Sequence, residues 1–287
     1  MTDKTLNLKG KLVPLTTPLV MGILNVTPDS FYADSRKQTE KSIEERIRTI
    51  YEEGGDVIDL GGYSSRPDAQ EVSAKEEMQR LAFALEIINR HYPEAIVSVD
   101  TFRADIAREC VEKYGAAIIN DISGGEIDPE MFPAVAALQV PYILMHMRGT
   151  PQTMQQFTAY KDMMEEILLY FSEKVNRLRL LGVNDIILDP GFGFSKTVDQ
   201  NYELMAHLNE FAAFDLPLLV GISRKSMIYR FLGGEPADSL NGTSVLNTYS
   251  LLHGANILRV HDVKEAVEAV RITTKLTVPN SQCSILN

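Results

Sequence analysis

Polar side chains suited to binding and catalysis recur at one kind of position in this chain, directly after a short apolar segment. A carboxylate at such a position offers two oxygens side by side to paired N–H donors, and an arginine, lysine or histidine can bind an anion. Short apolar segments bounded by turn-forming residues are typical of buried strands. The recurrence therefore indicates an enzyme that draws its active site from the ends of several strands. The residues concerned are Asn25, Asp59, Asp100, Asn120, His146, Asp189, Lys225, Arg259 and His261.

Eight apolar segments are expected to form the strands that position these side chains. A polar residue after any one of them means little by itself, because strands end in loops. The concentration of Asp, Asn, Lys, Arg and His over the whole set favours a shared cleft instead. The segments are Leu19–Leu24, Val57–Ile58, Ala95–Val99, Ala116–Ile119, Pro141–Met145, Asp185–Leu188, Leu216–Val220 and Ala255–Leu258.

Helical patterns lie between these segments. Ser73–Glu76 has the form of a capping box at the start of a helix. Asp128–Pro129 predicts an N-cap followed by proline at the first helical position. Met163–Leu181 is amphipathic and is followed by Gly182, which is typical of a helix C-terminus.

The alternation of strands and helices predicts an α/β protein with a parallel sheet. It continues to a last helix over Val263–Leu276, for which Asp262 is the expected cap. Eight such units in about 250 residues favour a single-domain (β/α)8 TIM barrel, and an open doubly wound sheet is the alternative. We expect residues 1–18 to form an N-terminal arm, 19–276 the barrel and 277–287 a C-terminal tail.

The composition narrows the classes of partner. The chain of 287 residues has 28 basic and 39 acidic residues, a formal charge of −11, which argues against a nucleic-acid surface. Its apolar runs are shorter than the roughly 18 residues of a membrane span, and its start has no secretory pattern. The two cysteines, Cys110 and Cys283, offer no disulfide framework, and we expect Cys110 to be a small core residue. These features predict a cytoplasmic enzyme of small molecules.

Several motifs resemble those of the dihydropteroate synthase family. Met21–Phe31 (MGILNVTPDSF) is similar to the first signature of that family, and Asp59–Pro67 (DLGGYSSRP) to its second, usually close to DIGGESTRP. Others follow in the family's order, and together the resemblance covers about Leu19 to Ile272. The remaining motifs are Ser98–Thr101, Asn120–Gly125, Leu188–Phe194, Gly221–Ser226 and Arg259–Asp262.

The resemblance implies a (β/α)8 barrel that condenses a dihydropterin pyrophosphate with p-aminobenzoate to give dihydropteroate and pyrophosphate in folate biosynthesis. Asp189 resembles the carboxylate that accepts paired N–H bonds from the pterin edge. Asp100 and Asn120 resemble the other ring contacts, and Lys225 the cation that donates to the ring carbonyl and nitrogen. Arg259 is the fifth pterin-directed residue that the resemblance implies.

The leaving pyrophosphate requires positive charge and oriented donors. Arg259 and His261 come just before a predicted helix, whose N-terminus also favours an anion. Asn25 resembles the family's ligand near Mg²⁺ and pyrophosphate, and its amide oxygen suits that ion. Ser65 and Arg66, in the second motif, are further pyrophosphate candidates.

The mechanism implied by the resemblance is a dissociative substitution at the exocyclic methylene of the pterin. Asp100, Lys225, Arg259 and His261 are its expected catalytic residues, and positioning and electrostatics supply the catalysis. Two loops, at about 27–38 and 63–72, are expected to close over the site. A homodimer through outer barrel helices is also implied. The residues expected to contact p-aminobenzoate are Phe31, Pro67, Ser223 and Ser226.

The chain departs from the family pattern in these two loops. Ala33 stands where the family has aspartate, with Asp34 one position later. In the second loop Tyr63 replaces the usual glutamate, Ser65 a threonine, and Asp68 a glycine that would have access to positive φ. These changes lie on the aminobenzoate side, whereas the pterin and pyrophosphate residues are intact.

Two alternative functions remain open from the sequence. A methyltetrahydrofolate-dependent methyltransferase domain would share the pterin carboxylates but needs no pyrophosphate site. A non-catalytic pterin-binding paralogue would explain the loop changes. Pyrophosphate release without a partner protein would rule out the second, and a requirement for a corrinoid partner would favour the first.

Overall fold

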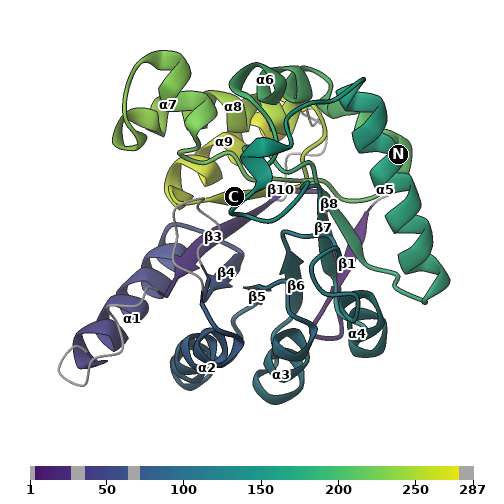
Figure 1. The fold of residues 1–287 in the computed structure, drawn as a ribbon. Coiled ribbons are helices and arrows are strands. Elements are labelled where there is room, and N and C mark those ends of the chain that lie inside the picture. The colour runs from purple at the N-terminus through teal and green to yellow at the C-terminus, as the bar shows by residue number, and fades with distance from the viewer. Residues whose placement is uncertain (1–3, 27–35, 64–71, 278–287) are drawn as a thin grey trace.

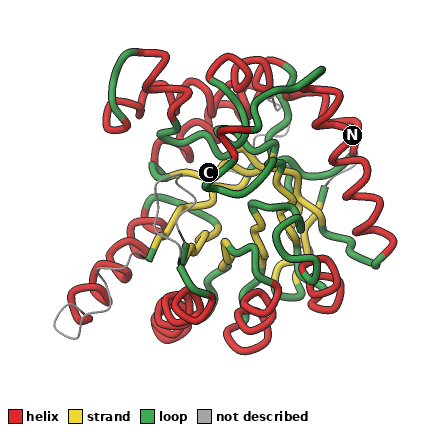
Figure 2. The backbone as a smooth tube through the Cα atoms, in the orientation of Figure 1, coloured by secondary structure: helices red, strands yellow, loops and turns green. Residues whose placement is uncertain are grey.

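A computed structural model of the chain describes residues 4–26, 36–63 and 72–277. Parallel strands occupy the centre and helices surround them (Figures 1 and 2). The barrel strands are β3 Leu19–Asn25, β4 Val57–Gly61, β5 Val97–Asp100, β6 Ile118–Asp121, β7 Tyr142–Met145, β8 Ile186–Asp189, β9 Leu219–Val220 and β10 Ile257–Val260. The helices are α1 Arg36–Glu52, α2 Ala74–His91, α3 Ala104–Tyr114, α4 Met131–Leu138, α5 Met163–Leu180, α6 Val198–Ala206, α7 Ser226–Leu232, α8 Leu240–Leu252 and α9 Val263–Thr277. Short 3₁₀ helices within the described ranges are η2 Met154–Gln156, η3 Leu208–Phe214 and η4 Pro236–Ser239.

The eight strands form one parallel sheet that closes on itself. The order β8-β7-β6-β5-β4-β3-β10-β9 leaves β8 and β9 at the two ends. A parallel bridge between Leu188 and Leu218 joins these ends, and Leu188 N donates to Pro217 O at 2.9 Å. The predicted (β/α)8 barrel is therefore confirmed, and the open doubly wound sheet is wrong.

Two of the predicted strand ends lie inside strands instead. Asp59 is the third residue of β4, which continues to Gly61, and Arg259 lies within β10. Both side chains face the barrel interior, where they form an ion pair with each other. A charge can lie within a buried strand when an opposite charge and hydrogen bonds satisfy it.

The lower part of the barrel is filled by apolar side chains from the first residues of the strands. A hairpin of β1 Thr5–Leu8 and β2 Lys11–Pro14 packs against this layer through Leu6, Leu8 and Leu15. Each fully buried leucine contributes about 1.5–3 kcal/mol, so the hairpin is a stable cover for this end of the barrel. The strand residues of the layer are Met21, Val57, Ile118, Ile143, Ile187, Leu219 and Ile257.

The helix termini follow the sequence expectations at two places. The Ser73 side chain accepts a bond from Glu76 N at 3.2 Å at the start of α2. Gly182 follows the C-terminal cap of α5 with φ of 84°. The expected Cys110 core position is also confirmed, since this thiol is fully buried and burial raises its pKa to about 12.

The predicted cap at Asp128 is wrong. The helix that follows, α4, begins at Met131 with Glu130 at its N-cap. The Asp128 carboxylate accepts from Glu130 N at 3.0 Å through Oδ1, and through Oδ2 it accepts from Ala104 N, the first residue of α3, at 2.8 Å. Helix α3 has Arg103 at its own N-cap, which forms no side-chain cap bond, so a residue 24 positions later supplies the missing acceptor.

Asp262 precedes α9 as expected, and its carboxylate is engaged by another residue. Arg224 donates to it through Nε at 2.9 Å and a terminal nitrogen at 2.5 Å. The pair ties the segment after β9 to the segment after β10. None of the described helices is both long and apolar enough to cross a membrane.

Candidate active site

A charged layer lies directly above the apolar layer inside the barrel. Arg259 is at its centre, with Nε at 2.6 Å from Asp59 Oδ2 and a terminal nitrogen at 3.0 Å from Asp100 Oδ2. Strand alternation explains the grouping, because residues two apart in neighbouring parallel strands point to the same face. Residues predicted separately from β5 and β10 therefore meet at one point.

Asp59 is the buried counter-charge of Arg259, and the sequence analysis placed it at a strand end without giving it a substrate or catalytic role. It is 0% exposed and also accepts from Ser98 Oγ at 2.7 Å. Asn120 Nδ2 donates to its two oxygens at 3.3 and 3.4 Å. The predicted ring contact Asn120 thus lies in the same network as Arg259. The sequence signal was the lone charge among apolar residues of β4.

Burial raises the pKa of Asp100 to about 7, although the positive charge of Arg259 opposes this shift. The other buried carboxylates, Asp59, Asp121 and Asp189, raise it further. Near neutral pH this carboxylate therefore changes between its neutral and charged forms. A group that titrates near the working pH in a polar barrel mouth is typical of an active site.

Asp189 and Lys225 are two further opposite charges of the mouth, and each opposes the effect of burial on the pKa of the other. Asp189 ends β8, is 6% exposed, and accepts from Gly191 N at 2.8 Å. Burial raises its pKa, and the nearby Lys225 charge opposes the rise. Burial lowers the pKa of Lys225 to about 8, against the effect of Asp189. Lys225 donates to Phe192 O and lies 4.7 Å from the centre of the Phe194 ring.

His261 is neutral at physiological pH in this structure. Burial, together with the charges of Arg259, Arg224 and Arg46, lowers its pKa to about 4 despite the opposing Asp262. Its Nδ1 lies 3.1 Å from Ser223 Oγ, which also accepts from His261 N at 3.1 Å. Ser223 is therefore buried against His261. The histidine can offer an N–H to an anion, rather than a positive charge.

A cleft of about 500 Å³ opens beside this layer. Asn25 and His261 line it, and Arg259 is not among its lining residues. Two unpredicted arginines supply its positive charge. Arg46 of α1 donates to Ile23 O at 3.0 Å and to His261 O at 2.8 Å. In the sequence, the sign that could have pointed to Arg46 is an arginine near the apolar Ile43 and Ile47, which are buried in α1. Helix α1 was not among the expected helices.

The second unpredicted arginine, Arg224, immediately precedes Lys225 in the motif Gly221–Ser226. It lines the cleft together with its partner Asp262, and the side-chain hydrogen bond to Asp262 raises its pKa. Its φ of 55° turns consecutive side chains apart, so Arg224 reaches the cleft and Lys225 reaches Asp189. This left-handed conformation is rare for a residue other than glycine.

Tyr63, where the family has glutamate, is part of an aromatic cluster at the mouth. Its ring meets the ring of Phe102 edge-on at 5.2 Å between centroids. Gln152 donates to its hydroxyl at 2.5 Å, and Arg103 lies 5.8 Å from its ring centre. Aromatic and cation–π contacts thus occupy the place of the family's carboxylate.

Several predicted residues lie outside the described part of the chain. They are Phe31, Ser65, Arg66 and Pro67, together with the departures Ala33, Asp34 and Asp68. Ser226 is described as the first residue of α7 and is half-buried. The predicted aminobenzoate contacts are therefore described only at Ser223 and Ser226.

The donors in the cleft fit Mg²⁺ only as an ion shared with a phosphate ligand. Asn25 offers an amide oxygen at the end of β3, and the nearby Asp262 is already paired with Arg224. Mg²⁺ is usually bound by one or two protein oxygens plus substrate phosphates and water, which this arrangement allows.

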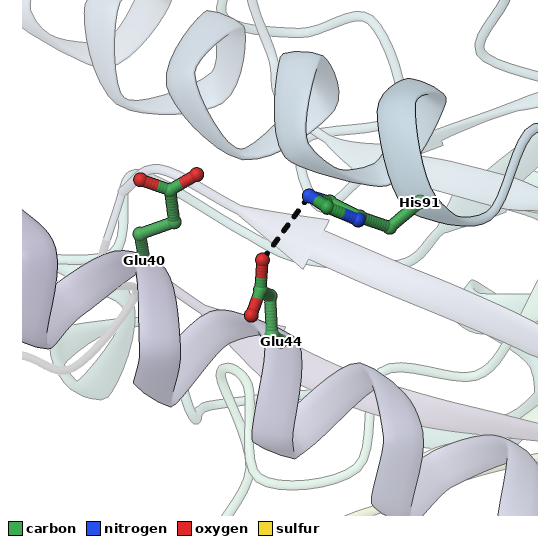
Figure 3. Close-up of side chains that lie close together, drawn as sticks. All are labelled: Glu40, Glu44 and His91. Atoms are coloured by element: carbon green, nitrogen blue, oxygen red, sulfur yellow. Dashed lines mark ion pairs between the residues drawn. The ribbon is translucent and has the colours of Figure 1, made fainter.

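Within the described residues, one cluster of potential metal ligands lies between α1 and α2, away from this cleft. Figure 3 shows Glu40, Glu44 and His91, with a His91–Glu44 ion pair at 3.2 Å. Glu40 is paired with Arg90 at 3.1 Å. These contacts account for the cluster as ion pairs between the two helices.

Comparisons with known proteins give the family of this chain. A family model described as pterin binding enzyme matches residues 21–261. The dihydropteroate synthase of Escherichia coli strain K12 is 43% identical over 266 residues, covering 92% of this chain and 93% of that protein. The structure of Yersinia pestis dihydropteroate synthase with a sulfonamide drug is 39% identical with a TM-score of 0.85, covering 95% and 98% of the two chains. The Xanthomonas albilineans dihydropteroate synthase with 4-aminobenzoic acid is 35% identical with a TM-score of 0.86, covering 97% and 100%.

Proposed function

This chain belongs to the dihydropteroate synthase family of pterin-binding enzymes, and on that premise we propose how its barrel mouth carries out the reaction. The enzyme is a transferase that condenses 6-hydroxymethyl-7,8-dihydropterin pyrophosphate with p-aminobenzoate to 7,8-dihydropteroate and pyrophosphate. One observation supports the assignment of roles: the opposite charges of Asp189 and Lys225 act on each other beside the Asp59–Arg259–Asp100 network.

The pterin edge binds at Asp189. This carboxylate is buried, and one of its oxygens already has the Gly191 N–H as a donor, which fixes its plane. A fixed carboxylate matches two adjacent N–H groups of an aminopyrimidinone edge. Lys225 donates to the ring carbonyl and nitrogen, and the amide of Asn120 contacts the ring from the opposite side of the mouth.

Asp100 stabilises the cation that forms when pyrophosphate leaves. The exocyclic methylene becomes positively charged and conjugated with the pterin, and a nearby carboxylate lowers the energy of that state. Arg259 keeps Asp100 and Asp59 in place, because it bonds both at once. The amine of p-aminobenzoate then attacks the methylene and releases a proton. No side-chain nucleophile takes part, so positioning and electrostatics supply the catalysis.

The leaving pyrophosphate lies in the cleft lined by Asn25, Arg46, Arg224 and His261. His261 donates an N–H to it while Ser223 holds the other ring nitrogen. Arg259 contributes its charge from within the barrel. Asn25 would hold Mg²⁺, which neutralises phosphate charge when bound. A cationic cleft next to the pterin carboxylates supports the synthase over the methyltransferase, which needs no pyrophosphate site.

The aminobenzoate binds on the side of the mouth formed by Ser223 and Ser226, with Phe31 and Pro67 against its ring and Ser65 and Arg66 toward the pyrophosphate. The family resemblance assigns the changes at Ala33, Tyr63 and Asp68 to the same substrate. A Ser65→Thr, Asp68→Gly double variant is expected to change the KM for p-aminobenzoate. Identical aminobenzoate constants would show that the two changes are neutral.

Pyrophosphate release tests the function directly. The protein is mixed with dihydropterin pyrophosphate and Mg²⁺, with and without p-aminobenzoate, and Asp189→Asn serves as the matched variant. We expect amine-dependent release that is lost in the variant, since its amide leaves a pterin N–H unpaired at a cost of about 2–4 kcal/mol. Tight pterin binding without turnover would overturn the synthase assignment, and unchanged pterin affinity in Asp189→Asn would remove Asp189 from the site.

We also place the protein in the cytoplasm as a homodimer. Support for the dimer is an apolar face on α7, α8 and α9, which includes Phe231, Val245 and Ile272, each at least 60% exposed. Exposed apolar patches on several adjacent elements are typical of protein interfaces. Light scattering should give twice the chain mass, and Val245→Glu should give a monomer. Leu180→Glu, on the exposed end of α5, is the control that should remain dimeric. A monomeric wild-type protein would contradict the proposal.

A further inference from the structure

The segment after β8, Pro190–Lys196, directs its backbone carbonyls toward two lysines. Lys225 donates to Phe192 O. Lys196 donates to Gly191 O at 3.0 Å and to Phe194 O at 3.1 Å, and it is only 3% exposed. The mechanism above uses Lys225. Lys196 is a buried cation in the same loop to which that mechanism gives no role.

The third partner of Lys196 is His146, the residue directly after β7. Its Nδ1 lies 3.0 Å from Lys196 Nζ, and its side chain is 2% exposed. Burial and the Lys196 charge lower the pKa of His146 well below its usual value, so the ring is neutral and Nδ1 can accept. An ammonium group has three N–H donors, and here each has one acceptor. Burial also lowers the pKa of Lys196 to about 7.

The hydrogen bond from Lys196 to Gly191 O holds Gly191, whose N–H orients the Asp189 carboxylate. Gly191 N donates to Asp189 Oδ1 at 2.8 Å, while Gly191 O accepts from Lys196. Gly191 has φ of 72°, and a Cβ there would lie 2.0 Å from His146 O, so the turn packs tightly on the end of β7. Phe194 N also donates to Gly191 O at 3.1 Å within the turn, and Lys196 Nζ is the atom that ties this turn to the His146 side chain.

We propose that Lys196, with His146 as its acceptor, is a positioning residue for the pterin-directed carboxylate Asp189. This inference rests on the proposed pterin-binding function of Asp189. Lys196 does not contact the substrate, because its three donors are already used within the protein. Without the ammonium, His146 Nδ1 and Phe194 O lose this donor and Gly191 O keeps only Phe194 N. The turn then shifts, and the carboxylate no longer matches the pterin edge.

Lys196→Met tests the proposal, with Lys113→Met on the exposed surface of α3 as control. Calorimetry with dihydropterin pyrophosphate should show an affinity about tenfold weaker in Lys196→Met and an unchanged affinity in the control. In steady-state assays the pterin KM should rise while the p-aminobenzoate KM stays constant. A loss of folded protein alone would lower the apparent kcat and leave both KM values unchanged, and that pattern, or wild-type pterin affinity, would overturn the proposal.

A matched pair at His146 provides a second test that does not depend on the folding of Lys196→Met. Asparagine has an oxygen near the position of Nδ1, so His146→Asn should keep most of the pterin affinity. His146→Leu removes the acceptor and should lose about as much as Lys196→Met. Equal loss in both would overturn the role of the acceptor.

Asp189→Asn belongs in the same series because it separates the two proposals. If it keeps full pterin affinity, the proposed function of Asp189 is wrong. If it loses affinity while Lys196→Met and both His146 variants do not, only the positioning role is wrong.

Discussion

Replacing Asp59 by asparagine tests the charge arrangement inside the barrel most sharply. The Asp59 carboxylate is fully buried and accepts from Ser98 Oγ at 2.7 Å and from Arg259 Nε at 2.6 Å. Asparagine has nearly the same shape, but one oxygen becomes an NH₂ group that faces another donor. The substitution therefore removes a charge and an acceptor without opening a cavity.

The structure sets the size of the effect. Removing one partner of a buried ion pair costs about 3–5 kcal/mol. Arg259 keeps a second carboxylate, Asp100, at 3.0 Å, so we expect the lower end of that range, about 3 kcal/mol. In a domain of this size each kcal/mol lowers Tm by about 2–4 °C, which gives a fall of about 6–12 °C.

Thermal unfolding followed by circular dichroism, at mildly alkaline pH, measures this change. Ser98→Ala is the control, since it removes one neutral hydrogen bond from the same carboxylate and should cost about 1 kcal/mol. The kcat/KM for dihydropterin pyrophosphate should also fall in Asp59→Asn, because Arg259 is no longer held on both sides. A Tm within about 2 °C of the wild-type value, or equal losses in the two variants, would refute the idea that Asp59 balances the buried charge of Arg259.

Three further predictions address titration, the cleft and a helix terminus. Turnover should rise with pH and level off above about 7 as Asp100 ionises, whereas Asp100→Asn should be slow and show no such rise; a flat wild-type activity profile would contradict the assignment. Because the pKa of Asp100 is higher in the folded than in the unfolded state, the stability that it contributes should fall as pH rises from about 4 to 7. Arg46→Met should raise the KM for dihydropterin pyrophosphate about tenfold, because His261 O and Ile23 O lose their donor. Arg48→Met, on the exposed side of α1, should leave this KM unchanged, and equal KM values for the two variants in steady-state kinetics would exclude Arg46 from the site. Asp128→Ala should lower the free energy of unfolding by about 1 kcal/mol in denaturant titrations, because Ala104 N at the start of α3 loses its acceptor, and Glu130→Ala should not. An unchanged free energy of unfolding in Asp128→Ala would contradict this role of Asp128.

The sequence was sufficient for the eight barrel strands, for several of the helices and for the type of fold. Apolar segments such as Leu19–Leu24 and Asp185–Leu188 are strands because their local pattern and their turn residues agree. The caps at Ser73 and Gly182 were also predictable, since the atoms involved lie within a few residues of each other. Family-like motifs then indicated the pterin-directed residues, and the structure brings Asp100, Asn120, Asp189, Lys225 and Arg259 to one mouth of the barrel.

The tertiary structure decided what depends on distant contacts. Arg259 pairs with Asp59, 200 residues away in the sequence, and neither the pairing nor the burial of Asp59 is present in a local pattern. Asp128 caps a helix that precedes it, and Arg46 reaches a cleft from a helix that the sequence analysis did not single out. The protonation states of Asp100, His261 and Lys225 likewise follow from burial and neighbouring charges. Local propensity acts over one or two turns of chain, whereas desolvation and ion pairing are fixed only when the barrel closes.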